Sequence, residues 1–341
     1  MKDDLRHPDY RNDCNDCNDR DGVRLLADIG GTNARFALET APGCIAHVTT
    51  LACADYPLLA DAVRAYLAVH AGADVRHAVI AIANPVDGDL VAMTNHHWRF
   101  SSQATRIVLG LDTLLIVNDF AALAAALPTL AAADWTAIGG GVATPHATVG
   151  LLGAGTGLGV AGLVRCGSAW EVLPSEGGHV AFSPMDAREQ AILAFCWQRH
   201  PHVSTERLVS GPGLRVIHEA LAATTGGNWA PLTSADIIAR GLSGADALCR
   251  ETLDCFCAML GTAAANLAVT FGARGGIYIG GGIVPRLGAW FADSPFRARF
   301  ENKGRFSAFT AQIATRVITA PYPALAGAAA LLDNHLQGVS A

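Results

Sequence analysis

The sequence predicts an α/β protein with two related halves. From Val23 onward, apolar runs of strand length alternate with segments of helical periodicity, which is typical of α/β proteins. A strand, a glycine-rich turn with a threonine, and a second strand occur twice, near residues 28 and 155. At 341 residues, the chain is longer than one simple core accommodates, so we expect two domains or lobes.

The individual elements follow from periodicity and from turn residues. The first half is expected to contain a hairpin, a helix capped by Asp55, a buried strand, a short apolar strand and a helix broken at Pro128, at residues 23–40, 55–72, 77–86, 113–120 and 121–133. The second half is expected to contain a second hairpin, a long helix, a strand with a glycine-rich turn, and a strand followed by the final helix, at residues 147–164, 248–271, 275–286 and 315–335.

Composition excludes several classes of partner. Apolar residues make up 51% of the chain and charged residues 16%, as in a well-packed globular protein. The net charge is −6 and Lys2 and Lys303 are the only lysines, which argues against nucleic acid and anionic membranes as partners. No run reaches the roughly 18 uncharged apolar residues of a membrane span. The odd number of cysteines, nine, suits a reducing compartment, so a cytoplasmic location is expected.

Residues 1–22 differ from the rest because they are rich in Asp, Asn and Arg and nearly free of aliphatic residues. Such a composition cannot bury enough apolar surface to fold, so we expect a disordered extension. Cys14 and Cys17 form a C-x-x-C pair there, but a zinc site needs a second pair of ligands, which we do not find.

Three glycine-rich turns each follow an apolar strand, at Asp28–Asn33, Gly153–Gly159 and Ile279–Arg286. Backbone without a Cβ lets phosphate oxygens approach its N–H groups, and Thr32 and Thr156 add hydroxyl donors. Either of the first two turns alone would be read as an ordinary hairpin turn. Their occurrence on matching strands favours phosphate binding, and the third turn could admit a nucleobase or ribose.

Other nucleotide and hydrolase motifs fail on their defining residues. No Gly-Lys dipeptide occurs, so the chain has no P-loop. Leu158 interrupts the G-x-G-x-x-G spacing of dinucleotide-binding turns. The sequence "GLSGA" lacks the final glycine of the esterase nucleophile elbow.

Asp119 stands where the apolar strand "LLIV" ends, directly after Asn118. Ligands of open α/β sheets bind beyond the carboxyl ends of strands, and a carboxylate there could take the proton of a substrate hydroxyl during phosphoryl transfer. The alternative is that Asp119 only caps the following helix.

Glu176, His179 and Glu206 are further polar candidates. Carboxylates, an amide and an imidazole without lysine suit a neutral ligand with many hydroxyl groups, such as a sugar. As alternatives, His179 could be an ordinary buried histidine, and "STERL" could simply begin a helix with Ser204 as its cap.

These segments together resemble one known family. "LADIGGTNARFAL", "VNDF", "GAGTGLGVA", "EGGHV", "ERLVSGPGL" and "GGIVPR" occur in the order found in bacterial glucokinases, within the hexokinase–actin fold superfamily. The resemblance covers residues 23–335. It implies a two-lobed actin-like ATPase (ribonuclease H-like) fold, with two related α/β domains around a central cleft. After residues 1–22, the small domain would comprise 23–129 with 318–338, and the large domain 130–317.

The resemblance also implies an activity, which is transfer of the γ-phosphoryl group of ATP to the 6-hydroxyl of glucose. Asp119 would be the general base and, with Asn118, Glu176, His179 and Glu206, would bind the sugar. Asp28 would hold Mg²⁺ through water. The nucleotide would contact Ala27, Asp28, Ile29, Gly30, Gly31, Thr32, Asn33, Gly153, Gly155, Thr156, Gly157, Gly280, Gly281 and Gly282.

Zinc is not expected, because related sugar kinases and repressors of the ROK group carry a cysteine cluster after the Gly-His element. Here the 17 residues after His179, from Val180 to Cys196, contain one cysteine, Cys196. A homodimer is common among resembling proteins and is expected here. Alternatives remain: a kinase of mannose or fructose, a donor such as ADP or polyphosphate, a non-catalytic sugar sensor, or a structural role like that of actin.

We predict that removal of residues 1–20 leaves kinase activity nearly unchanged, since this segment carries none of the candidate residues. Steady-state kinetics of the truncated and full-length chains would test this, and a tenfold loss of activity would contradict it.

Overall fold

The computed structural model describes residues 22–338, apart from residue 72, residues 94–95 and residues 226–229. The expected N-terminal extension, with Cys14 and Cys17, therefore lies outside the described residues, except for Gly22. The chain falls into two compact units: Met1–Thr129 with Pro321–Ala341, called the small unit here, and Leu130–Ala320, called the large unit.

The small unit contains a mixed sheet with the strand order β3-β2-β1-β4-β7. Strand β1 pairs antiparallel with β2, while β1, β4 and β7 are parallel to one another. The predicted first hairpin, the buried strand at β4 and the short apolar strand at β7 are confirmed, and the residues of β7 are half-buried. The strands of this unit, with the separate β5–β6 hairpin, are β1 (Val23–Ile29), β2 (Asn33–Ala41), β3 (Cys44–Ala52), β4 (Val75–Ile82), β5 (Leu90–Ala92), β6 (Arg99–Ser101) and β7 (Thr113–Asn118).

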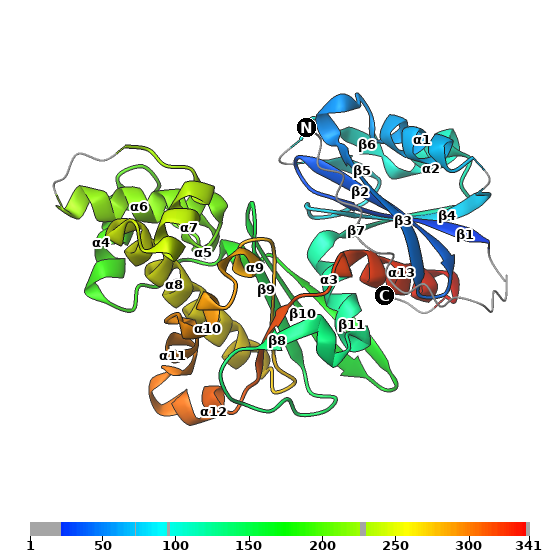
Figure 1. The fold of residues 1–341 in the computed structure, drawn as a ribbon. Helices are drawn as coiled ribbons and strands as arrows, with labels where there is room; N and C mark the ends of the chain where they lie inside the picture. Colours follow the sequence, from blue (N-terminus) through cyan, green and yellow to red (C-terminus); the bar gives the residue numbers. More distant parts are fainter. Residues whose placement is uncertain (1–21, 72, 94–95, 226–229, 339–341) are drawn as a thin grey trace. The chain divides into compact units, whose positions relative to one another are not determined.

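Helices cover both faces of this sheet, α1 and α2 on one face and α3 and α13 on the other (Figure 1). Alternate residues of β1, namely Leu25, Ala27 and Ile29, share a buried core with Tyr66 of α1, as the period of two in a strand requires. The helices are α1 (Leu59–Val69), α2 (Ser102–Leu109), α3 (Asp119–Ala126) and α13 (Pro323–Leu336). A 3₁₀ turn, Leu127–Thr129, ends α3 at Pro128, as predicted.

The predicted cap of α1 was wrong. The helix begins at Leu59 after Leu58, which makes no side-chain cap, and Asp55 instead ends a short 3₁₀ turn. The physical reason is Pro57, because a residue before proline avoids the helical region, and Tyr56 is indeed extended. Asp55 is therefore separated from the helix that it was expected to cap.

The large unit contains a second mixed sheet, ordered β11-β10-β9-β12-β13-β8. Its central strands β9, β12 and β13 are parallel, and β9 and β10 form the predicted second hairpin. The strands are β8 (Trp135–Ala137), β9 (Val149–Ala154), β10 (Leu158–Cys166), β11 (Ala169–Ser175), β12 (Ile277–Gly280) and β13 (Thr315–Ile318). Each unit thus has a glycine-turn hairpin next to parallel strands.

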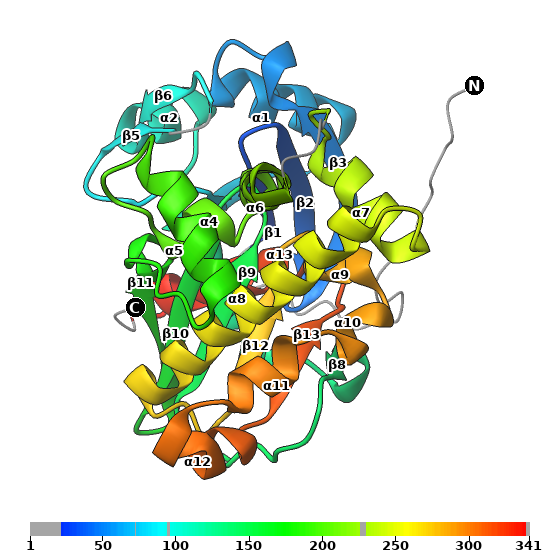
Figure 2. The ribbon, with the colours of Figure 1, turned by 90° about the vertical axis from the view of Figure 1, so that its left-hand side faces the viewer.

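The predicted long helix is confirmed as α8, which runs across this sheet (Figure 2). It is long and apolar enough to cross a membrane, but 78% of its most apolar window is buried inside the protein, as in a core helix. Cys249, Cys255 and Cys257 are core residues of it, as interpreted. The helices are α4 (Ala187–Trp197), α5 (Thr205–Leu208), α6 (Gly211–Thr225), α7 (Ser234–Ser243), α8 (Ala247–Phe271), α9 (Val284–Leu287), α10 (Trp290–Asp293), α11 (Phe296–Glu301) and α12 (Ser307–Ala311).

The packing of α13 on α3 leads to a stability prediction. A Cβ at Gly327 would overlap the carbonyl of Ala122, because the two helices touch there through their backbones. We expect Gly327→Ala to lower the free energy of unfolding by about 1–3 kcal/mol, the usual cost of overpacking a core. Urea unfolding measures this. Gly140→Ala, which adds the same methyl group into open space, should change it little, and equal effects of the two would contradict the prediction.

Candidate active site

In the small unit, the carboxyl ends of three parallel strands lie at one edge of the sheet. The register aligns Ile29 of β1 with Ile82 of β4, and Ile82 with Asn118 of β7. Since neighbouring strands are about 4.8 Å apart, the ends of β1 and β7 are separated by about 10 Å. The structure therefore brings the glycine turn after Asp28 and the Asn118-Asp119 pair to the same edge.

The turn Asp28–Asn33 is both a hairpin turn and an exposed stretch of backbone. The N–H of Gly30 donates to the carbonyl of Asn33 at 3.0 Å, and the carbonyl of Thr32 accepts from the N–H of Cys53 at 2.9 Å. Thr32 and Asn33 are exposed, and a Cβ at Gly30 would meet only the Asn33 carbonyl, at an ordinary 3.8 Å. The residues Thr32 and Asn33 are thus accessible at this turn, whereas the N–H of Gly30 is bonded within it.

Asp28 has a partner that the sequence analysis missed. Nη1 of Arg35 lies 2.9 Å from Oδ2 of Asp28, across the β1–β2 pair in which the two residues are directly opposed. Burial raises the pKa of Asp28 above its usual value, while the charge and hydrogen bond of Arg35 oppose that rise. The guanidinium also lies 5.1 Å from the ring centre of Tyr322. The sequence could have indicated this pair, because in a hairpin that turns at residues 30–33, Asp28 and Arg35 stand opposite each other.

At the end of β7, Asn118 rather than Asp119 is the N-cap of α3. Oδ1 of Asn118 accepts from the N–H groups of Phe120 at 2.9 Å and Ala121 at 3.0 Å. Nδ2 of Asn118 donates to the carbonyl of Asn84 at 3.3 Å. Asp119 is the first residue of α3, and its Oδ1 also accepts from Phe120 N–H, at 2.9 Å. The capping role proposed as the alternative for Asp119 thus falls mainly on its neighbour.

In the large unit, residues Gly153–Gly157 cover the end of β9 and its turn into β10; because phosphate binding is expected here, we call this segment the phosphate turn. Two of the predicted glycines are required by packing: a Cβ at Gly153 would overlap Gly280, and one at Gly281 would overlap the carbonyl of Ala154. Gly281 also has a φ of +78°, which favours glycine. Gly155 and Gly282, by contrast, have open space where a Cβ would stand. Of the glycines predicted to contact nucleotide at these two turns, Gly155 and Gly282 therefore leave room beside the backbone for a ligand.

The predicted sugar residues Glu176 and His179 lie in a short segment directly after β11. The N–H of His179 donates to the carbonyl of Glu176 at 2.9 Å, and both side chains are exposed. Between them, Gly178 is buried against the carbonyl of Leu158, where no Cβ would fit. This close approach places the segment beside the start of β10, next to the phosphate turn.

Glu206 joins this group from α5. Its Oε2 accepts from the N–H of Leu158 at 2.8 Å, and its Oε1 lies 3.9 Å from Nε2 of His179. Ser204 caps the helix by accepting from Arg207 N–H at 3.2 Å, so the helix-start interpretation is confirmed. That interpretation does not exclude the functional one, since Glu206 still faces His179 and the turn.

The residues present fit a magnesium–nucleotide complex better than a resident metal site. Within the described residues, no group of three or more His, Cys, Asp or Glu side chains could hold a metal ion. Mg²⁺ bound with ATP needs few protein ligands, because phosphates and water fill most of its coordination sphere. One carboxylate, Asp28, beside a turn with the exposed residues Thr32 and Asn33 meets that requirement.

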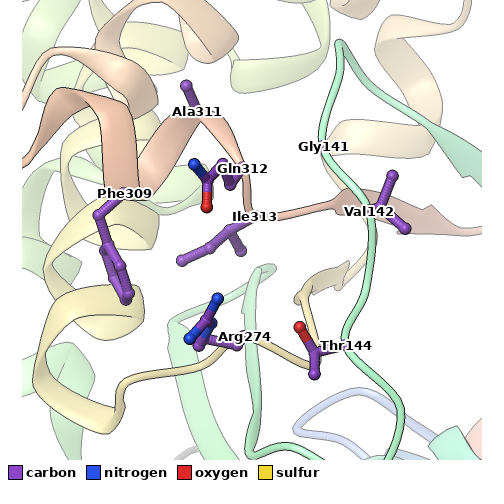
Figure 3. A pocket seen from close by; sticks show the side chains of 8 residues that line it. All are labelled: Gly141, Val142, Thr144, Arg274, Phe309, Ala311, Gln312 and Ile313. Atoms are coloured by element: carbon purple, nitrogen blue, oxygen red, sulfur yellow. The ribbon is translucent and has the colours of Figure 1, made fainter.

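A cavity of about 400 Å³ lies elsewhere in the large unit and contains none of the predicted residues (Figure 3). Thr144, Arg274 and Ile313 come shortly before β9, β12 and β13, so the cavity is at the amino ends of these parallel strands. The glycine turns are at the opposite, carboxyl ends, where α/β sheets bind their ligands. The cavity is lined by Gly141, Val142, Thr144, Arg274, Phe309, Ala311, Gln312 and Ile313.

Comparison with known proteins gives a consistent result. The model of the glucokinase family matches residues 25–335. A glucokinase of Chromobacterium violaceum is 57% identical over 313 residues, covering 92% of this chain and 90% of the relative. A glucokinase of Neisseria meningitidis is 53% identical, covering 93% and 96%. A bifunctional protein of Burkholderia pseudomallei is 56% identical, but the chain spans only 50% of its length.

Solved structures agree in fold. A glucokinase from an Antarctic psychrotroph superimposes with a TM-score of 0.82 at 37% identity, covering 92% of this chain and all of that one. A Balamuthia mandrillaris glucokinase in complex with glucose gives 0.78 at 21% identity, covering 91% and 93%, and so supports the fold alone. The predicted α/β fold of the hexokinase type is thus confirmed. By sequence and by structure, the chain belongs to the glucokinase family.

Proposed function

We propose that this chain transfers the γ-phosphoryl group of ATP to the 6-hydroxyl of glucose, with Asp119 as the general base. Membership of the glucokinase family makes the overall reaction the ATP-dependent phosphorylation of glucose. The observation that carries the assignment of residues is the position of Asp119, at the first residue of α3 and on the same sheet edge as the Asp28 turn.

The carboxylate of Asp119 stands at the N-terminus of helix α3. The N-terminus of a helix carries a partial positive charge, and the N–H of Phe120 donates to Oδ1 of Asp119. An ionised carboxylate can accept the proton of the sugar hydroxyl as that oxygen attacks phosphorus. Such a base contributes about 10²–10⁴ in rate.

The sugar would be bound by Glu176, His179 and Glu206 of the large unit, together with Asn118 and Asp119. These groups offer carboxylate, amide and imidazole atoms that match hydroxyl groups, which both donate and accept. Asn118 differs from the others because its amide oxygen already caps α3. Its contribution to the sugar would therefore come through the amide nitrogen, or would share the oxygen with the helix.

The nucleotide would contact the two glycine turns and the turn after β12. Asp28 would hold Mg²⁺ through water, and the bound ion would neutralise negative charge on the phosphates. Arg35 provides a fixed positive charge at the same turn, since it lies within 2.9 Å of Asp28. Together with backbone N–H groups, the guanidinium of Arg35 would supply the positive charge that a lysine supplies to the phosphates in P-loop proteins.

We also propose that the protein is a cytoplasmic homodimer that acts in glycolysis. Among the described residues, Cys53, Cys196, Cys249, Cys255 and Cys257 are buried free thiols, whereas Cys44 is disulfide-bonded, so the cysteines support a reducing compartment only in part. Mannose or fructose as the preferred hexose, another phosphoryl donor, and a non-catalytic sugar sensor are the alternatives that turnover measurements would separate.

The proposed base is tested by Asp119→Asn, which keeps the oxygen that accepts from Phe120 N–H but cannot take a proton. We expect kcat to fall by about 10²–10⁴. The measurement is ADP release with Mg-ATP and, separately, glucose, mannose, fructose and N-acetylglucosamine. Asp112→Asn, the same change at an exposed ion pair with Arg76, should leave kcat unchanged. An Asp119 variant that keeps more than a tenth of wild-type kcat would refute the assignment.

Arg35→Met should destabilise the protein, because it leaves the Asp28 carboxylate without its counter-charge. We expect a loss of about 1–3 kcal/mol near pH 7, the cost of leaving a partly buried charged group without its partner. The pKa of Asp28 is already raised by burial and would rise further. Folded protein then binds a proton more readily than unfolded protein, so stability falls as pH rises through the raised pKa.

The measurement for Arg35→Met is urea unfolding at pH 5 and pH 7.5, with the larger loss expected at pH 7.5. A second change, Asp28→Asn, removes the orphaned charge and should restore most of the stability. If the loss is the same at both pH values, or if Asp28→Asn restores nothing, the ion pair does not control the stability of this turn.

A further inference from the structure

We propose that Glu206 is also a positioning residue: its carboxylate holds the phosphate turn, and this couples sugar binding to nucleotide binding within the large unit. The inference rests on the proposed function, in which Glu206 binds the sugar and the turn Gly153–Gly157 binds phosphate. What it adds is a physical connection between the two subsites through one side chain.

The first observation is the pair of contacts made by the carboxylate. Oε2 of Glu206 accepts from the N–H of Leu158 at 2.8 Å, and that N–H belongs to the peptide that ends the phosphate turn. Oε1 lies 3.9 Å from Nε2 of His179, on the side of the predicted sugar residues. The side chain is 31% exposed, so a ligand can reach it while protein still shields most of it. A charged acceptor in that setting makes a strong hydrogen bond.

The second observation is that Gly157 is a glycine because of Glu206. Its φ lies outside the left-handed region, so its backbone conformation does not demand glycine. A Cβ at this position would instead overlap Oε2 of Glu206. The carboxylate therefore packs directly against the turn and also hydrogen-bonds to it.

The third observation is that the same segment holds the turn at a second point. The N–H of Gly211, at the start of α6, donates to the carbonyl of Gly155 at 2.8 Å. Inside the turn, the N–H of Gly155 donates to the carbonyl of Gly157 at 2.8 Å. Residues 206–211 thus determine where the N–H groups of the phosphate turn point.

A coupling between the ligands follows from this arrangement. A sugar hydroxyl that donates to Glu206 restricts the carboxylate to one orientation, and the restricted carboxylate restricts the turn. Nucleotide then binds to a turn that is already ordered. By linkage, glucose and nucleotide must raise each other's affinity by the same factor. Loss of this hydrogen bond should weaken nucleotide binding about tenfold, because the turn must then be ordered when the nucleotide binds.

The test uses Gly157→Ala, Glu206→Ala and the double variant, with Mg-AMPPNP and glucose as the ligands in isothermal titration calorimetry. The added methyl group displaces the flexible end of Glu206 and leaves its charge in place. We expect Gly157→Ala to weaken Mg-AMPPNP about tenfold and to remove most of the coupling with glucose. In the Glu206→Ala background, the same methyl group should have no further effect on Mg-AMPPNP affinity, because the side chain that it displaces is gone.

Two further measurements separate the link from other causes. Gly140→Ala, where nothing lies within 4 Å of the added Cβ, should behave like wild type. Hydrogen exchange of the Leu158 amide, measured without ligands, should become faster in Gly157→Ala and in Glu206→Ala. If Gly157→Ala lowers the affinity for Mg-AMPPNP equally with and without Glu206, the methyl group acts on the nucleotide directly. That result would overturn the proposal.

Failure of this inference differs from failure of the proposed function. If wild type phosphorylates glucose but binds glucose and Mg-AMPPNP independently, the coupling through Glu206 is wrong and the kinase assignment stands. If wild type binds both ligands without turnover, the kinase assignment is wrong, and the variants still decide the coupling. A wild-type protein that binds neither ligand overturns both.

Discussion

Close contact of backbone with backbone is the constraint on which the candidate site of the large unit depends. Gly178 lies against the carbonyl of Leu158, and Gly281 lies against the carbonyl of Ala154, at distances where any side chain would overlap. These contacts hold the segment after β11 and the turn after β12 beside the phosphate turn. Interiors are too densely packed to absorb an added methyl group without a shift of backbone. Gly178 and Gly281 are therefore needed for the packing of this edge of the sheet. Gly155, by contrast, has open space where a Cβ would stand, and a ligand could occupy that space.

In the small unit, the dipeptide Asn118-Asp119 has both a structural and a proposed chemical role. Asn118 satisfies the first N–H groups of α3, and this leaves Asp119 as the first helical residue, where the helix dipole favours a negative charge. A cap at Asp119 itself would have placed that carboxylate one residue earlier, at the end of the strand. Local capping thus determines where the proposed base stands, and the parallel register of β1, β4 and β7 determines that it shares an edge with Asp28.

Lysine is scarce in this chain, and an arginine provides the positive charge at the predicted phosphate site of the small unit. Lys303, the lysine that the structure describes, is hydrogen-bonded to Asn266 and lies between α11 and α12 in the large unit. Arg35 is held by Asp28 on one side and by the ring of Tyr322 on the other. Because a guanidinium stays charged at all physiological pH values, this site keeps its cation even where burial raises the pKa of the neighbouring carboxyl.

The sequence by itself determined the α/β class, both glycine-turn hairpins, the long core helix and the candidate residues, because periodicity, glycine and proline act over a few neighbouring positions. It missed that Asp28 is paired with Arg35, and it misplaced the cap of α1, where Pro57 keeps Tyr56 extended. Only the tertiary structure decided that Glu206 meets the N–H of Leu158, 48 residues earlier in the chain. No local pattern specifies such a contact, since it depends on how β10, α5 and the segment after β11 pack together.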